Sequence, residues 1–318
     1  MNTDTDDSGD LDQLLAEVTE HAKPSADDGK VADYIPSLAE VDPNLFALAA
    51  VEMDGTEHAT GDSGVAFPIQ SMSKVFALVL AMQLTEDDGE GVSEELWRRV
   101  GREPSGDPFN SLVQLEREKG VPRNPMINAG ALIVDDILLD HCDDVRGSMI
   151  ELLSDLAGEE VGVDESVLQA EGDTSSRNMA MANLMASFGN LHHPVDDVLG
   201  AYIHQCAISM TSLQVARAVR FLANDGTDPA SGRQILPPRL ARRVAAIMLT
   251  CGTYDAAGEF AFTVGLPCKS GVAGSIACLV PEKMGVCVWS PPLEPSGNSL
   301  AGRVALSELS SRLNLTVF

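Results

Sequence analysis

The 318-residue chain has little positive charge. Its 21 lysine and arginine residues stand against 48 aspartate and glutamate residues, which gives a formal net charge of −27. Nucleic acids and other polyanions are bound through clustered cations, so we expect no nucleic-acid partner. An acidic surface suits a protein that stays soluble in concentrated salt, where ions screen the repulsion between its charges. We therefore expect a halophilic source, and an ordinary acidic cytosolic protein is the alternative.

The sequence also lacks paired cysteines and long apolar runs. Its six cysteines contain no Cys-x-x-Cys pair, and most lie in apolar stretches, which predicts buried free thiols rather than a disulfide framework. The longest uncharged apolar run, residues 75–84, is too short to cross a bilayer, and the N-terminus has no apolar core of a secretory signal. We expect a cytoplasmic protein without a membrane partner.

Aromatic residues make up only 4% of the chain, but hydrophobic residues make up 44%, which is enough for a large core. Apolar runs at both ends of the chain predict strands at residues 45–51, 57–60, 260–264, 268–280 and 284–289. Between them the periodicity is helical, with helices expected at 112–118, 131–139, 149–156, 179–187, 195–207, 213–224 and 240–249, and a last helix opens after residues 297–299.

This order of elements predicts an α+β fold. Its antiparallel sheet comes from both chain ends and is flanked by helices, with a large all-helical insert. We expect an acidic tail at residues 1–28, disordered at its start and then forming a short amphipathic helix. The rest, 29–318, is one domain: residues 29–70 and 252–318 form a sheet subdomain, and 71–251 form a mainly helical subdomain.

Ser71 and Lys74 lie three residues apart where an apolar helix begins, so their side chains share one face. Free N–H groups and the helix dipole favour negative charge at that end. A serine hydroxyl beside an amine that accepts its proton is an activated nucleophile. The alternative is a helix cap followed by a solvated lysine, because Ser-x-x-Lys is common by chance.

A Lys-Ser-Gly run at residues 269–271 begins one of the predicted strands. Such a run, with Ser-x-x-Lys upstream, is the arrangement of acyl-serine enzymes with the β-lactamase type of fold. A second ammonium on Lys269 would lower the pKa of Lys74, which must be neutral to accept the proton of Ser71. The alternative for Lys269 is a solubility charge at a strand edge.

The same strand has two further expected roles. We expect Gly271 to let the substrate approach the strand closely. The backbone N–H groups of Ser71 and Val272 would then form an oxyanion hole.

Nine sequence runs carry a specific resemblance, spread from Gly29 to the C-terminus. They are 30–36, Gln70-Ser71 with Lys74, 101–106, 124–131, Glu171 with Arg177-Asn178, 251–255, 265–274, 289–293 and 297–299. In these runs the sequence resembles the serine-dependent glutaminase family. It departs from that family in the acidic segment before Gly29, and it lacks the repeat extension of animal members.

The resemblance implies Ser71 as nucleophile and Lys74 as base, with Tyr254 and Lys269 also catalytic. The family's glutamine-contacting positions fall on Ser71, Asn128, Glu171, Asn178, Tyr202, Tyr254 and Val272, with Tyr34 close by. It also implies no metal or organic cofactor, and a homodimer or homotetramer.

The residue types suit free glutamine. Glu171 is a natural partner for the substrate ammonium, and Asn128, Asn178 and Tyr34 can donate to its carboxylate. Tyr254 or Tyr202 could relay a proton to the leaving ammonia. The chain has only three tyrosines, and each falls on a site position.

Two polar pairs invite other interpretations. His192-His193 has no third metal ligand at a supporting spacing, so we expect a loop pair. Asp135-Asp136 are expected to be solvated at a helix end.

The sequence therefore predicts a glutaminase that hydrolyses L-glutamine to L-glutamate and ammonia. One alternative is another acyl-serine hydrolase on the same fold, such as an esterase or a penicillin-interacting enzyme. The other is a non-catalytic glutamine sensor that keeps the pocket.

Overall fold

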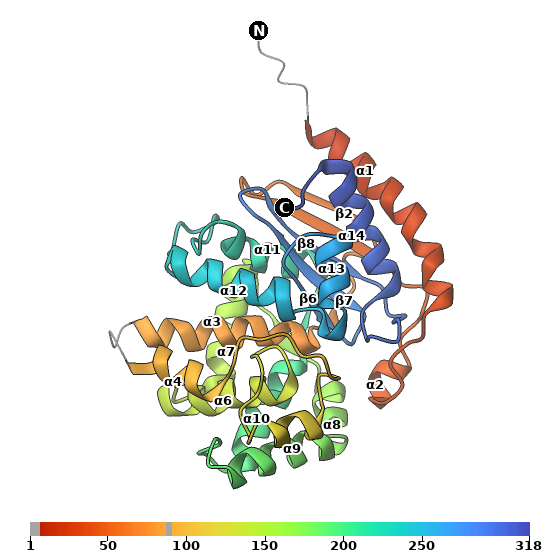
Figure 1. The fold of residues 1–318 in the computed structure, drawn as a ribbon. Helices are drawn as coiled ribbons and strands as arrows, with labels where there is room; N and C mark the ends of the chain where they lie inside the picture. The colour runs from red at the N-terminus through yellow and green to blue at the C-terminus, as the bar shows by residue number, and fades with distance from the viewer. Residues whose placement is uncertain (1–6, 87–90) are drawn as a thin grey trace.

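A five-stranded antiparallel sheet lies at the centre of one lobe of the computed structural model, which describes residues 7–86 and 91–318 (Figure 1). Its strand order is β2-β1-β8-β7-β6. The strands are β1 (Ala47–Glu52), β2 (Glu57–Gly61), β6 (Cys268–Gly271), β7 (Ser275–Val280) and β8 (Met284–Trp289). Because β1 pairs directly with β8, the two ends of the sequence meet inside the sheet, as predicted.

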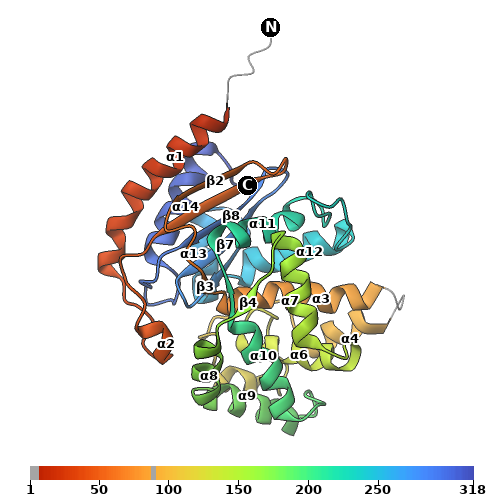
Figure 2. The same cartoon turned by 180° about the vertical axis from the view of Figure 1, so that it is seen from behind.

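Both faces of the sheet are covered. Successive side chains of a strand point to opposite faces, and in β1 Leu48 packs into one core while Ala49 packs into the other. One face lies under α14 (Leu300–Leu313) and α13 (Ala257–Thr263), and the other lies on α11 (Ser212–Ala223) (Figures 1 and 2). Two buried faces explain why the strands are almost continuously apolar in sequence.

Helix α1 (Asp7–Ala22) occupies most of the segment that we expected to be an acidic tail. The amphipathic helix predicted there is present, but it packs along α14 and buries Leu15 and Val18 completely. Arg312 of α14 donates to Glu17 at 2.6 Å. Residues 7–28 are therefore part of the sheet lobe rather than a tail, and the disorder predicted at the start lies outside the described residues.

The middle of the chain is helical, as predicted. Its helices are α3 (Ser73–Glu86), α4 (Gly91–Arg99), α5 (Leu112–Arg117), α6 (Asn128–His141), α7 (Val145–Ala157), α8 (Glu165–Asp173), α9 (Ser176–Ser187), α10 (Val195–Cys206), α11 and α12 (Pro238–Cys251). Helices α4 and α8 were not predicted. A small second sheet was also missed, with strands β3 (Phe67–Pro68), β5 (Ile208–Met210) and β4 (Gly162–Val163) in that order. The predicted border between the subdomains stays a prediction, and α11 lies directly on the large sheet.

Two strand predictions were wrong in detail. Residues 260–264 lie mostly in α13, where Phe260 is 2% exposed and Phe262 is 88% exposed, because residues two apart in a helix point to different sides. Residues 268–280 form two strands joined by a turn. At that turn Gly274 has φ +92°, and a Cβ there would lie 2.3 Å from the Ser290 carbonyl oxygen.

The predicted free thiols are confirmed, since all six cysteines are unpaired and five of them are buried. No helix within residues 7–86 and 91–318 combines the length and the apolar character needed to span a membrane.

Candidate active site

Ser71 lies in a short 3₁₀ turn, Gln70–Met72, that leads directly into α3. Gln70 has φ +49°, a left-handed conformation that non-glycine residues adopt at a cost of about 1–3 kcal/mol, often at functional sites. The turn presents Ser71 to a cavity, whereas Ser73 is fully buried within the first turn of α3. Of the two serines in the motif, only Ser71 lines a space that can hold a substrate.

Lys74 lies in the first turn of α3 with only 1% of its surface exposed. Its Nζ donates to Oδ1 of Asn128, the first residue of α6, at 2.6 Å. Burial lowers the pKa of Lys74 from 10.5 to about 8, although the nearby Glu171 and Asp135 act in the opposite direction. A lysine with such a pKa is neutral part of the time near neutral pH, so it can accept a proton.

Lys269 lies on β6 and is also fully buried. Its Nζ donates to the Ser270 carbonyl oxygen at 2.7 Å and lies 4.7 Å from the centre of the Tyr254 ring. Burial lowers the pKa of Lys269 well below its usual range, and the charge of Lys74 lowers it further.

The expected cause of the lowered Lys74 pKa is not the main one. We expected the Lys269 ammonium to lower it, but burial is the largest cause. Repulsion between the two ammonium groups acts on the pair, and it lowers the pKa of Lys269 in addition to burial.

Gly271 has a different role from the one we expected. A Cβ at this position would lie 2.8 Å from the Ile69 carbonyl oxygen and 2.9 Å from Ser275 Oγ. The missing side chain therefore lets β6 pack closely against the turn that carries Ser71, and substrate access is not its reason. Among the described residues, no backbone carbonyl accepts a hydrogen bond from the N–H of Ser71 or Val272, and the oxyanion hole stays a prediction.

A cavity of about 290 Å³ opens in front of Ser71. It is lined by Tyr34, Ile35, Gln70, Ser71, Phe109, Asn110, Asn128, Glu171, Thr174, Arg177, Asn178, Tyr202 and Val272. Seven of the eight predicted substrate-binding residues are in this lining, and the eighth, Tyr254, is buried beside Ser71. The structure thus brings together residues that lie far apart in the sequence.

Tyr254 is close enough to Ser71 for that serine to affect its pKa. Its backbone has φ +59°, its hydroxyl donates to the Ser270 carbonyl oxygen at 3.1 Å, and an interaction with the Ser71 side chain lowers its pKa against the effect of burial. Burial raises the pKa of Tyr254 above its usual value of 10, and burial raises that of Tyr202 as well. Both phenols therefore keep their protons near neutral pH.

The far wall of the cavity carries the groups expected to hold an amino acid. Glu171 of α8 is 7% exposed, and burial raises its pKa above the usual value despite the opposing effect of Lys74. A buried carboxylate of this kind is stabilised by a cation such as a substrate ammonium. Asn128 Nδ2 donates to Asn178 Oδ1 at 3.0 Å, which orients the two amides relative to each other.

Sequence reasoning missed several residues near the site. Gln70 and Arg177 line the cavity, and the buried Cys206 is close enough to Tyr202 to help raise the pKa of that phenol. A single residue without a spacing pattern gives no signal in sequence, although Gln70 and Arg177 did lie inside the quoted runs.

The prediction that Asp135 and Asp136 are solvated was wrong, since both are fully buried. Burial raises the pKa of Asp135 to about 8, and Gln205 donates to its carboxylate. Asp136 forms an ion pair with Arg99.

Comparisons with known proteins agree with this site. A family model described as Glutaminase matches residues 29–318. A protein of Methylobacterium radiotolerans named glutaminase is 49% identical over 312 residues, covering 97% of this chain and 99% of its own length. That coverage extends beyond residues 29–318, so part of the N-terminal segment is aligned too, contrary to our expectation that the resemblance would stop at Gly29.

Solved structures give the same result. The structure titled probable glutaminase ybaS has a TM-score of 0.90 at 33% identity and covers 99% of both chains. A probable glutaminase from Bacillus subtilis, complexed with 6-diazo-5-oxo-L-norleucine, has a TM-score of 0.85 at 31% identity and covers 100% of this chain and 98% of its own. The predicted fold class, a β-lactamase-like α+β fold, is thereby confirmed.

Proposed function

Because the chain belongs to the glutaminase family, we propose that it hydrolyses L-glutamine to L-glutamate and ammonia through a glutamyl ester on Ser71. The observation that carries this proposal is the position of Ser71. It lines a cavity of about 290 Å³, close to the lower end of the usual range for ligand pockets, about 300–1,000 Å³. Three residues further on, in the first turn of α3, lies Lys74, a buried amine whose pKa is lowered to about 8.

In the first half of the reaction, neutral Lys74 takes the proton from Ser71 Oγ. The oxygen forms a bond to the side-chain amide carbon of glutamine, and the carbonyl electrons move onto oxygen. The N–H groups of Ser71 and Val272 hold this oxyanion. When the carbon–nitrogen bond breaks, the leaving nitrogen receives a proton either from the Lys74 ammonium directly or from Tyr254, which the Lys74 ammonium then reprotonates, so that Lys74 is neutral again.

In the second half, water attacks the glutamyl ester and gives up a proton to the neutral amine of Lys74. The ester bond to Ser71 breaks, the serine oxygen regains a proton, and glutamate leaves. Every step is a proton transfer or an acyl transfer among this chain's own side chains, the substrate and water.

Substrate selection rests on the far wall of the cavity. Glu171 pairs with the substrate ammonium, while Asn128, Asn178 and Tyr34 donate to its carboxylate. With both ends of the amino acid held, the length of the side chain decides whether its amide reaches Ser71. Ammonia release from asparagine should therefore be much slower than from glutamine, and equal rates would contradict this assignment.

Two alternatives are separated by simple assays. A glutamine sensor would bind glutamine in a calorimeter without releasing ammonia, whereas an esterase or a penicillin-interacting enzyme would hydrolyse a chromogenic β-lactam but not glutamine. The pairing of Ser71 with a deprotonatable Lys74 favours the enzyme over the sensor, because binding alone needs neither a nucleophile nor a base.

We also propose that the protein works in the cytoplasm in high salt, as a homodimer or homotetramer. The charge of −27 supports the salt requirement, since screening shortens the repulsion between surface acids. Dialysis into low salt should lower activity and helical ellipticity together, and retention of both would contradict the requirement. Light scattering on the eluting protein measures the subunit number, and a monomer at assay concentration would contradict the oligomer.

A further inference from the structure

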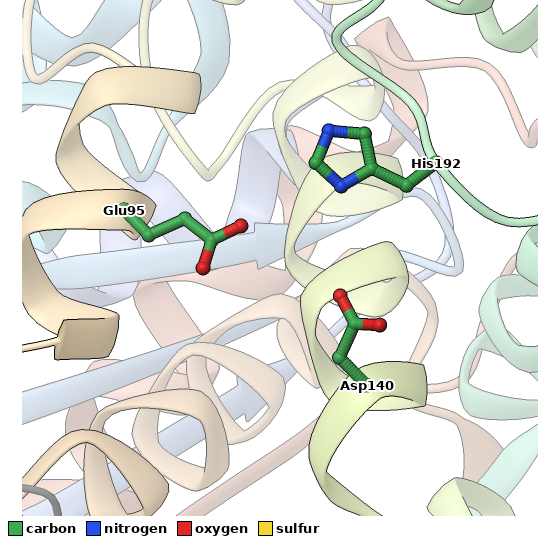
Figure 3. A group of neighbouring side chains, drawn as sticks. All are labelled: Glu95, Asp140 and His192. Atoms are coloured by element: carbon green, nitrogen blue, oxygen red, sulfur yellow. The ribbon is translucent and has the colours of Figure 1, made fainter.

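Three side chains that can bind metal converge away from the catalytic cavity. They are Glu95 of α4, Asp140 of α6 and His192 of the segment before α10, and Figure 3 shows them turned toward a common space. Their ligand atoms all lie within 4.8 Å of one another. Spacing in the sequence hid this group, because 45 and 52 positions separate its members.

A buried carboxylate, that of Asp136, fixes the backbone position of His192. The backbone N–H of His192 donates to Asp136 Oδ2 at 3.0 Å, and that of His193 donates to Oδ1 at 2.8 Å. Asp136 is fully buried and lies one helical turn before Asp140 on the same face of α6. The loop that carries the imidazole is therefore anchored to the helix that carries one of the carboxylates.

Helix α4 is held in the same way. Arg99 lies one turn after Glu95 and forms a buried ion pair with Asp136, and it also donates to the Asn190 carbonyl oxygen at 2.8 Å. The three ligand-bearing segments are thus joined by one network of hydrogen bonds centred on Asp136. This network keeps the side chains of Glu95 and Asp140 facing each other.

The carboxylates of Glu95, Asp136 and Asp140 carry more negative charge than the neighbouring cation offsets. The Arg99 guanidinium serves both Asp136 and Glu95, which lies 3.3 Å away. Within residues 7–86 and 91–318, Asp140 has one ion-pair contact, with His193 Nε2 at 3.4 Å, and this imidazole carries a charge only when it is protonated. Three carboxylates with one permanent cation leave a net attraction for a further positive charge.

We propose that Glu95, Asp140 and His192 bind a divalent transition-metal cation of the Mn²⁺ or Zn²⁺ class, with water in the remaining positions. One imidazole and two carboxylates suit such a cation, whereas Ca²⁺ and Mg²⁺ prefer oxygen ligands alone. The cation crosslinks α4, α6 and the His192 loop. It is outside the catalytic cavity and takes no part in the acyl transfer.

The expected consequence is stability of the helices that place the catalytic lysine. Helix α6 begins with Asn128, which accepts from Lys74, and α4 packs against both α3 and α6. A ligand that binds the folded chain and not the unfolded one raises the melting temperature.

The test starts from the full-length enzyme after removal of metals with a chelator and dialysis into about 1 M NaCl, which screens diffuse attraction to the acidic surface. Mn²⁺ binding is followed by the loss of the free-ion electron paramagnetic resonance signal, and Zn²⁺ by calorimetry. We expect one saturable site per chain and a rise in Tm of about 3 °C or more at saturation. Glu95→Gln, Asp140→Asn and His192→Ala should each weaken binding about 10- to 100-fold.

The matched control is His141→Ala, because His141 is exposed and follows Asp140 but is not one of the three ligands. It should bind like the wild type, and its basal glutaminase rate, like that of the three variants, should stay within about twofold of the wild type. Binding that is equal in the wild type and all three ligand variants would overturn the proposal, as would no saturable binding of either cation.

Discussion

Two segments from opposite parts of the chain each bring a buried lysine to the same site, and they do so with different results. The start of α3 brings Lys74, whose Nζ is hydrogen-bonded to an amide side chain and whose pKa falls to about 8. Strand β6 brings Lys269, whose pKa falls much further because the Lys74 charge adds to burial. Lys74 thus retains the ability to change its protonation state near neutral pH, while the surroundings of Lys269 disfavour its ammonium form more strongly.

The contrast indicates that the two lysine amines have different roles at the site. The fall from 10.5 to about 8 means that the surroundings of Lys74, with burial as the largest cause, disfavour its ammonium form by about 3 kcal/mol net. This is enough to make it a base near physiological pH without removing its ability to return the proton. Lys269 instead fills the space beneath the Tyr254 ring and hydrogen-bonds with the backbone of its own strand.

The largest expected effect follows loss of the nucleophile that both segments surround. Ser71→Ala should lower kcat by at least about 10⁴-fold while the circular dichroism spectrum stays unchanged, because it removes the hydroxyl that forms the ester. The matched control is Ser73→Ala, two residues away and fully buried. Retained turnover in Ser71→Ala, or an equal loss in Ser73→Ala, would contradict the assignment, and the assay is ammonia release from glutamine.

The second prediction separates the base from its neighbour. Lys74→Ala should lower kcat by about 10²- to 10⁴-fold, the usual contribution of a general base. In the wild type, kcat/KM should rise with pH and level off above about 8, where Lys74 is mostly neutral. A value of kcat/KM that stays constant between about pH 6 and pH 9 would contradict a base with this pKa.

The third prediction concerns the tyrosine above Lys269. Tyr254→Phe removes the hydroxyl that interacts with Ser71 and is placed to pass a proton to the leaving group, and it should lower kcat by about 10- to 100-fold with little change in KM. Tyr202→Phe is the control, because its hydroxyl contacts Cys206 and its ring lies 5.6 Å from Lys74 Nζ. The assignment of the proton donor reverses if Tyr202→Phe is the slower of the two variants.

The smallest effect on rate is expected for Lys269→Met, which keeps the volume and loses an amine whose charged form is strongly disfavoured by burial. We expect kcat to fall by no more than about tenfold. Because the pKa of Lys269 is lower in the folded chain than in the unfolded chain, the unfolded state binds more protons below pH 10.5, and wild-type stability rises with pH toward that value.

Removing this amine should therefore raise Tm at neutral pH and flatten its dependence on pH. Melting curves of the wild type and Lys269→Met at about pH 7 and pH 9.5 measure both effects. A variant that melts lower than the wild type at both pH values would contradict a strongly lowered pKa of Lys269.

Sequence reasoning was most successful where a residue belonged to a pattern. The apolar runs of β1 and β8 predicted strands because both of their faces are buried. The offset of three between Ser71 and Lys74 predicted their shared face, and seven predicted substrate-binding residues do line one cavity. These features depend on local spacing or on a whole run of residues, so they are visible in the sequence.

The errors arose where distant segments decide the outcome. Phe260 and Phe262 alternate like strand residues, but only their surroundings show that one is buried and the other exposed in a helix. Gly271 is small because a neighbouring carbonyl approaches it, and no local pattern reveals that neighbour. The relative pKa values of the two lysines likewise depend on burial that the chain acquires only on folding.

The most direct test of the central claim, that Ser71 is the nucleophile and neutral Lys74 its base, is covalent labelling. The enzyme is incubated with 6-diazo-5-oxo-L-norleucine, the glutamine analogue present in the Bacillus subtilis structure, and the labelled peptide is sequenced by mass spectrometry. The account predicts that the label is on Ser71, that its rate of attachment rises toward about pH 8, and that Lys74→Ala labels far more slowly. A label on Ser73, or equal labelling of the Ser71→Ala variant, would contradict it.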